Sequence, residues 1–310
     1  MTRPESPIPG SPVIPEVLEG GHRIRFSCTR GVPCWNACCA NIDVALTPYD
    51  IVRMKTRLGI TSTEFLRAYT VPYEFEKDGI AGVKLRPVED GTACRFMRPE
   101  GCSIYADRPT ACRYYPVALL AMRRQGEATE RDHYALVSEG HCLGHGNGPV
   151  KTIDDYRAEQ GLPEYDALAR GWRQLILKKK SCGPAIGTPS LKSRQLFFMA
   201  CYDIDTFRLF VASEAFGRLF ALPGDERARL LADDVELMLF AFRFLKQVLF
   251  GEHSIALNDS ATQARLAQWR GRHERIESEA AERRACIDAH ITEEEHEQAC
   301  VGGGGDWSGD

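Results

Sequence analysis

Cysteines give this 310-residue chain its clearest chemical signal. Four fall within the stretch CTRGVPCWNACC, and two of these are adjacent. The first half of the chain carries eight of them: Cys28, Cys34, Cys38, Cys39, Cys94, Cys102, Cys112 and Cys142. Thiolates are soft metal ligands and nucleophiles. A group this dense therefore binds metal, forms disulfides or does redox chemistry.

The N-terminal sequence bears on the choice between these three. It is rich in proline and has no apolar run of the kind that an export signal needs. We therefore expect a cytoplasmic protein, in whose reducing surroundings clustered cysteines indicate metal binding or catalysis rather than disulfides. No stretch approaches the ~20 apolar residues of a membrane span. The net charge of −4 gives no general indication of nucleic-acid binding.

The spacing of the cysteines leaves two kinds of metal site open. Structural zinc sites take four Cys or His ligands and usually include two cysteines about two to four residues apart. Here the separations are C-x5-C, C-x3-C, an adjacent pair, C-x7-C and C-x9-C, with no C-x2-C. An iron–sulfur cluster tolerates irregular spacing because its ligands bind several iron atoms. Spacing alone does not decide between zinc and an iron–sulfur cluster.

Other residues near the cysteines have alternative interpretations. Four arginines are either solvated surface or an offset to thiolate charge: Arg95, Arg98, Arg108 and Arg113. Three histidines are either exposed loop residues or further ligands: His133, His141 and His145. Three tyrosines are expected to pack around the site: Tyr105, Tyr114 and Tyr115. The remaining cysteines are interpreted as ordinary thiols: Cys182, Cys201 (in a helical core), Cys286 and Cys300.

Several segments resemble the YkgJ-type cysteine-cluster family of the CxxCxxCC type, which is described as zinc- or iron-chelating. They are FSC before a CC pair, LTPYDIVRMKTRLG, GTACRFMRPEGCSIYADRPTACRYYP and CLGHG, and together they cover about residues 24–148. The resemblance implies that all eight cysteines of the first half are metal ligands. The family commonly has C-x2-C-G-x-C-C, whereas this chain has C-x5-C and Trp35 in place of the glycine, so the role of Cys28 departs from the pattern.

The resemblance also bears on activity. Flagellin lysine methylases contain a related cysteine motif and are regarded as iron–sulfur proteins, which favours an iron–sulfur cluster here. A methylase activity does not follow, because the chain has no glycine-rich cofactor loop of the usual kind. A family resemblance supports a site more strongly than an activity.

Local patterns predict the elements that position the cysteines. Capping signals predict helices after Thr47, ending at Gly59, and after Thr61 and Thr152. Strands are expected at 22–26, at 133–137, and on both sides of a turn at 89–91. Further helices are expected over 164–180, in two aromatic-rich segments spanning 193–250 that should pack together, and over 259–298.

These patterns predict an α+β protein with a metal-stapled, cysteine-rich N-terminal domain and a mainly helical C-terminal region. The expected divisions are a disordered arm (1–21), the metal-binding domain (22–150), the helical region (151–298) and a disordered tail (299–310). The predicted function is binding of an iron–sulfur cluster, or of zinc. The alternatives are a cluster-dependent redox or methyl-transfer enzyme, and a zinc-stabilised protein whose helical region binds a protein partner; the sequence does not settle whether the chain is an enzyme.

Overall fold

The computed structural model describes residues 16–75, 80–122, 131–181 and 189–259, with scattered positions from 263 to 281. Most of the predicted arm, the predicted tail and most of the helix expected over 259–298 lie outside these residues. One compact unit runs to Phe216 and continues over Leu222–Ile255. A second consists of Gly217–Ala221 and the chain from Ala256, joined by a backbone hydrogen bond from Ala221 N to Ala256 O of 2.8 Å. The domain boundaries predicted from the sequence stay predictions.

Two helices near the cysteines begin at the predicted capping boxes. Helix α1 (Pro48–Leu58) has Thr47 as its N-cap, and the side chains of Thr47 and Asp50 each bond the other residue's backbone N–H. Gly59 ends this helix with a φ of 67°, in the left-handed region that glycine adopts at low cost. Helix α2 (Ser62–Tyr69) begins with the same arrangement of Thr61 and Glu64. Both predictions are confirmed because caps are decided locally.

The strands of the described residues form short antiparallel pairs. The pairs are β1 (Arg23–Phe26) with β8 (His145–Thr152), β2 (Thr70–Phe75) with β3 (Ile80–Leu85), β4 (Met97–Arg98) with β5 (Gly101–Cys102), and β6 (Val117–Met122) with β7 (Arg131–Leu136). The strands predicted at 22–26 and 133–137 are thereby confirmed. With the helices, these pairs make the α+β fold that was predicted.

One predicted hairpin, around residues 89–91, is wrong in its pairing. Strand β3 pairs with β2 instead, and after the turn the chain makes a single bridge between Pro87 and Cys94. The chain then turns, because Met97 N donates to Cys94 O at 3.1 Å. The N–H of Cys94 itself donates to Cys39 O at 2.7 Å. The predicted turn therefore forms, with Val88 N donating to Ala93 O at 2.9 Å, but the strands on its two sides pair with other strands.

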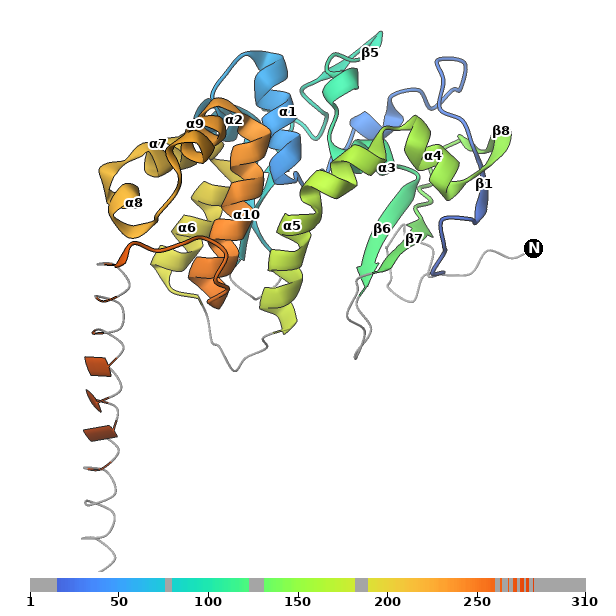
Figure 1. Cartoon of the computed structure of the whole chain (residues 1–310). Coiled ribbons are helices and arrows are strands. Elements are labelled where there is room, and N and C mark those ends of the chain that lie inside the picture. The colour runs from blue at the N-terminus through green and yellow to red at the C-terminus, as the bar shows by residue number, and fades with distance from the viewer. Residues whose placement is uncertain are drawn as a thin grey trace, which may run out of the picture. The chain divides into compact units, whose positions relative to one another are not determined.

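Most of the C-terminal helices of the first unit pack around α10, whereas α4 contacts α5 and β8 (Figure 1). The C-terminal helices are α4 (Ile153–Glu159), α5 (Leu162–Ser181), α6 (Leu191–Tyr202), α7 (Ile204–Ala212), α8 (Glu214–Leu219, whose end lies in the second unit), α9 (Gly224–Ala232) and α10 (Asp234–Phe250). Helix α10 lies between α5 and α6, as the contacts and Figure 1 both show. Phe207, Phe240 and Phe244 are buried there, which confirms the expected packing of the aromatic segments.

A second group of buried side chains lies beside the cysteine-rich segments. Its members are Leu18, Ile24, Phe26, Tyr114, Val117, Tyr134, Ile153, Tyr156 and Leu162, and Cys142 packs against them. These residues come from the two ends of the cysteine-rich region, which this core holds together. Within the described ranges, no helix is both long enough and apolar enough to span a membrane.

Candidate metal centre

The segment with the adjacent cysteines is a series of tight turns. Successive backbone hydrogen bonds join Val32 N to Thr29 O, Trp35 N to Val32 O, and Ala37 N to Cys34 O, each at 3.0 Å. The segment ends in the short 3-10 helix η1 (Ala37–Cys39). The Sγ atoms of Cys38 and Cys39 lie 3.9 Å apart. This winding holds Cys34, Cys38 and Cys39 on one short piece of backbone.

The β4–β5 hairpin is attached to this segment by Trp35 and Asn36. Asn36 Nδ2 donates to Arg98 O at 3.0 Å. Gly101 has a φ of 124°, and a Cβ on it would lie 3.1 Å from Cζ2 of Trp35. Trp35 therefore lies against the hairpin that carries Cys102.

Backbone hydrogen bonds bring Cys94 and Cys102 close to Cys39. Cys94 N donates to Cys39 O at 2.7 Å, which places the two residues side by side. Cys102 pairs with Met97, three residues after Cys94. Cys39, Cys94 and Cys102 are thus brought together although they are far apart in the sequence.

Cys112 is positioned by a buried carboxylate on α1. It lies in the short helix α3 (Thr110–Tyr114), whose first residue donates to Asp50 Oδ1 from its N–H at 2.8 Å and from its hydroxyl at 2.7 Å. Asp50 Oδ2 accepts from Thr47 N at 2.8 Å, and the residue is 0% exposed. The sequence identified Asp50 as part of a cap, but it gave no signal of this second role in anchoring the Cys112 helix.

Cys28 and Cys142 are joined by a different set of contacts. Ser27 N donates to Gly144 O at 3.2 Å. Leu143 N donates to the sulfur of Cys34 at 3.2 Å. The loop that carries Cys142 therefore lies between Cys28 and Cys34.

Gly144 offers a test of this loop. A Cβ at this position would lie 2.7 Å from Cε2 of Phe26 and 2.8 Å from Ser27 O, which is closer than atoms can approach. We expect Gly144→Ala to push the loop away, to cost about 1–3 kcal/mol of unfolding free energy and to lower bound metal. Gly140→Ala, in the same loop with no atom within 4 Å, is the matched control. Equal metal content and equal urea midpoints in the two variants would contradict this account.

The charges of the thiols act on one another. The pKa of Cys28 is raised by burial and then by the charges of Cys38, Cys34 and Cys142. Burial also raises the pKa of Cys94, Cys102 and Cys112, and neighbouring thiolates add to it. A hydrogen bond with Cys39 lowers the pKa of Cys38 to about 7, and the same bond raises that of Cys39. Mutual repulsion of this kind is what a bound cation would remove.

A comparison with known families identifies the segment that these cysteines occupy. Residues 27–142 match the family model CxxCxxCC, described as "Putative zinc- or iron-chelating domain". Residues 27–142 are similar to this family and are called the CxxCxxCC domain from here on. The match supports metal binding, with zinc or iron as the metal. No curated protein matches the chain, and no solved structure does.

Four arginines of the CxxCxxCC domain donate hydrogen bonds to backbone carbonyls. Arg95 donates to Pro87 O at 3.0 Å, Arg98 to Met97 O at 2.7 Å and Arg113 to Gln160 O at 2.7 Å. Arg108 donates to Tyr105 O at 3.0 Å. Two of them also face thiols, because the charges of Arg108 and Arg98 lower the pKa of Cys102 against the larger effect of burial. Charge offset, one of the two predicted alternatives, is therefore supported for Arg98 and Arg108, and the hydrogen bonds to backbone carbonyls are a role that the sequence did not predict.

The other candidate residues from the sequence differ in their surroundings. His145 packs edge-on against the ring of Phe26, with centroids 5.4 Å apart, and His141 lies 3.5 Å from a Glu139 oxygen. Tyr114 is buried and donates to Asp166 at 2.7 Å, as packing predicts. Cys201 is 2% exposed, which confirms it as a core residue of α6. The other three cysteines outside the domain (182, 286 and 300) are not among the described residues.

The eight cysteine thiols of the CxxCxxCC domain are chemically suitable ligands for a soft metal. As the side chains stand, the described residues contain no group of three Cys, His, Asp or Glu side chains converged on a metal position. Cysteine has three staggered rotamers, so its sulfur can be re-aimed without moving the backbone. The backbone contacts already bring the cysteine-bearing segments together. The assignment of the eight cysteines as ligands stays a prediction.

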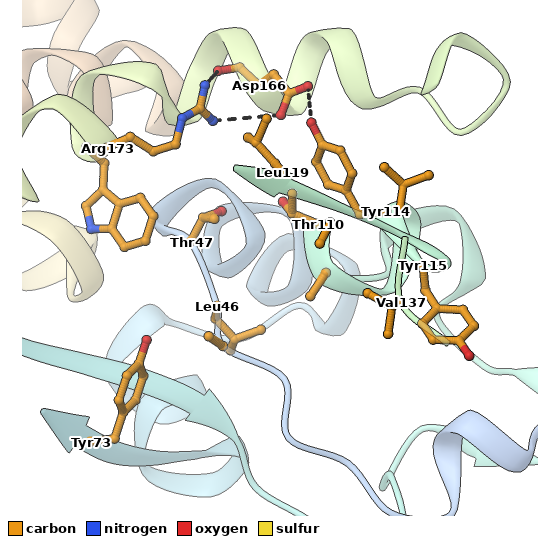
Figure 2. A pocket seen from close by; sticks show the side chains of 15 residues that line it. Leu46, Thr47, Tyr73, Thr110, Tyr114, Tyr115, Leu119, Val137, Asp166 and Arg173 are labelled. Carbon is orange, nitrogen blue, oxygen red and sulfur yellow. Dashed lines mark hydrogen bonds and ion pairs between the residues drawn. The ribbon is translucent and has the colours of Figure 1, made fainter. Parts of the chain in front are cut away.

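A mostly apolar cavity of about 360 Å³ is lined in part by Thr110, Ala111 and Tyr114 of α3, the helix that carries Cys112. Figure 2 shows Leu46, Leu119 and Val137 around it, with Asp166 and Arg173 at one edge. Two of its lining residues lead to thiols. Ala111 precedes Cys112, and Tyr115, whose pKa is raised by burial and by the charge of Cys142, also lines the cavity.

Proposed function

We propose that the CxxCxxCC domain binds an iron–sulfur cluster through its eight cysteines. The observation that carries the proposal is that segments from residue 28 to residue 142 meet at the η1 segment, so that thiols far apart in sequence become neighbours. The irregular spacing of these cysteines favours a cluster over a single zinc ion, because cluster ligands bind iron atoms spread over a larger body. A bound cluster would supply one-electron redox chemistry.

Electrostatics supports a metal of this kind. Burial raises the pKa of Cys28, Cys94, Cys102 and Cys112, which keeps these four sulfurs protonated near neutral pH, whereas metal binding needs thiolates. Loading should therefore release protons, and the affinity should rise with pH. Arg98 and Arg108, which face Cys102, offset part of the negative charge that remains.

The test is the colour and composition of anaerobically purified full-length protein. We expect brown protein with broad absorbance from sulfur-to-iron charge transfer, and with iron and acid-labile sulfide in similar amounts. Colourless protein with stoichiometric zinc would contradict the cluster and leave a thiol-bound metal site. Such zinc protein would support the alternative in which metal only stabilises the fold and the helical region binds a partner.

A second candidate function follows from the cavity beside the cysteines. A cluster-dependent redox or methyl-transfer enzyme needs a substrate site close to the cluster, and an apolar cavity with a few polar groups is the usual form of such a site. We expect a small apolar probe such as indole to change the electron paramagnetic resonance spectrum of the reduced protein. The variant Ala118→Phe, which fills the cavity, should abolish this change while keeping its iron content. An unchanged spectrum with bound indole would count against this function.

A further inference from the structure

The apolar cavity beside α3 has two charged side chains at one edge, and both come from α5. Asp166 and Arg173 line the cavity and lie seven residues apart, so they share one face of the helix at a spacing of two turns. Figure 2 shows them together at this edge, with Leu46, Leu119 and Val137 around the rest of the space. A ligand in the cavity would therefore meet apolar walls and one charged edge.

Each of these side chains has one buried atom without a hydrogen-bond partner among the described residues. The two atoms are Oδ1 of Asp166, a residue that is 4% exposed, and Nε of Arg173. The other carboxylate oxygen, Asp166 Oδ2, accepts from the Tyr114 hydroxyl and from Arg157 Nη2, each at 2.7 Å. Arg173 Nη1 lies 3.7 Å from Asp166 Oδ1, which is an ion pair but too long for a hydrogen bond. Buried polar atoms are nearly always bonded in folded proteins, so this acceptor and this donor indicate a polar group that enters the cavity.

The free acceptor and the free donor restrict the chemistry of that group. The charge of Asp166 is already offset by the guanidinium groups of Arg157 and Arg173, so a cationic ligand gains little there. A carboxylate would accept from Arg173 Nε but would bring its second oxygen against Asp166 Oδ1, with no proton between two acceptors. A carboxamide offers its carbonyl oxygen to Arg173 Nε–H and its own N–H to Asp166 Oδ1, so both unpartnered atoms become bonded.

We propose that this cavity binds a small uncharged carboxamide, held at its polar group by Asp166 and Arg173 and at its apolar part by Leu46, Leu119 and Val137. The cavity of about 360 Å³ is more than twice the volume of about 150 Å³ that holds a benzene molecule, so it has room for a ring and a short chain. The inference names a substrate class for the second candidate function. Its meaning as a substrate site rests on that function, whereas the binding itself requires no cluster.

The first test compares three ligands of nearly equal size on full-length wild-type protein. They are 3-phenylpropanamide, 3-phenylpropanoate, which has an oxygen in place of the amide NH₂, and 4-phenylbutan-2-one, which has a methyl group there. In ligand-detected nuclear magnetic resonance titrations we expect the amide to bind with a dissociation constant of about 1 mM or tighter. The other two should bind about tenfold or more weakly, because each leaves Asp166 Oδ1 unbonded. No binding of the amide, or equal binding of the amide and the ketone, would overturn the proposal.

Asp166→Asn tests which atom recognises the ligand. Tyr114 and Arg157 both donate to this position, so the new side chain should turn its oxygen to them and its NH₂ group to the cavity. The preference should then reverse, with 3-phenylpropanoate binding more tightly than the amide. Asp154→Asn is the matched control, because Asp154 also pairs with Arg157, at 2.9 Å, but does not line the cavity, and it should keep the wild-type order. The wild-type order in folded Asp166→Asn would refute the proposal, and if this variant does not fold, the comparison on wild-type protein decides.

The ligand titrations and the tests of the proposed function have separate outcomes. Brown protein whose spectrum responds to indole but that does not bind the amide would refute the carboxamide site alone. Protein that binds the amide but whose spectrum responds to neither ligand would confirm the site and count against its role as a substrate site beside a cluster.

Discussion

Asp50→Ala is expected to lower both the stability and the metal content of the protein. The carboxylate of Asp50 is fully buried and accepts bonds from Thr47 N, Thr110 N and the Thr110 hydroxyl. Burial raises the pKa of Asp50, and the bonds from Thr110 and Thr47 oppose that rise. Removing the carboxylate leaves buried donors without partners, at about 1–3 kcal/mol each. We therefore expect a loss of about 3 kcal/mol or more in unfolding free energy.

The loss of metal follows from the same contacts. Without Asp50, helix α3 is no longer tied to α1, and Cys112 loses its position. Asp155→Ala is the matched control, because Asp155 forms the same capping box at α4 but is exposed at its carboxylate and bonds Thr152 only. Urea unfolding and elemental analysis of both variants provide the measurement. Equal losses in the two would mean that Asp50 acts as a cap alone.

Lys55→Ala is expected to have a comparably large effect on stability. The Lys55 ammonium lies 3.0 Å from Asp205 Oδ2 and 2.8 Å from Asp234 Oδ2, and its side chain is 9% exposed. It joins α1 to α7 and α10, so that the helix with Asp50 is fixed to the helical part of the unit. Breaking a buried ion pair by removing one partner costs about 3–5 kcal/mol. Because both aspartates are partly exposed, we expect the lower end of that range.

Lys84→Ala is the control for this prediction. Lys84 also pairs with an aspartate, Asp43, at 2.6 Å, but Asp43 is exposed, and exposed pairs contribute about 0–1 kcal/mol.

The dependence of stability on acid pH provides a second measurement of the Lys55 ion pairs. Although burial raises the pKa of Asp205, bonds from Ser62 and Lys55 lower it overall. Its contribution is therefore present above the unfolded-state pKa and is lost as the pH falls through the lower folded-state pKa. Lys55→Ala should flatten this loss, and equal urea midpoints for the two lysine variants would contradict the account.

Local chemistry made much of the secondary structure predictable. The caps at Thr47, Thr61 and Thr152 depend on residues within one helical turn, and all three capping boxes form. The strands predicted on the two sides of the turn at 89–91 do not pair with each other, because strand pairing depends on residues far along the chain. The N–H of Cys94 donates to Cys39 O. Strand β3 pairs with β2, a strand that the sequence did not predict.

The sequence by itself determined the chemistry of the candidate site. The eight cysteines, their irregular spacing and the match of residues 27–142 to a zinc- or iron-chelating family model all indicate metal binding without any knowledge of the fold. These signals depend on residue type and on order along the chain, which the sequence contains in full.

Only the tertiary structure decided which cysteines are neighbours. The buried carboxylate of Asp50 links two helices 60 residues apart, Trp35 lies against Gly101, and the sulfur of Cys34 accepts from Leu143. Each of these contacts joins segments that are distant in sequence. A hydrogen bond or a close packing contact acts over a few ångströms, so its partner is chosen by where the folded backbone passes and not by spacing along the chain.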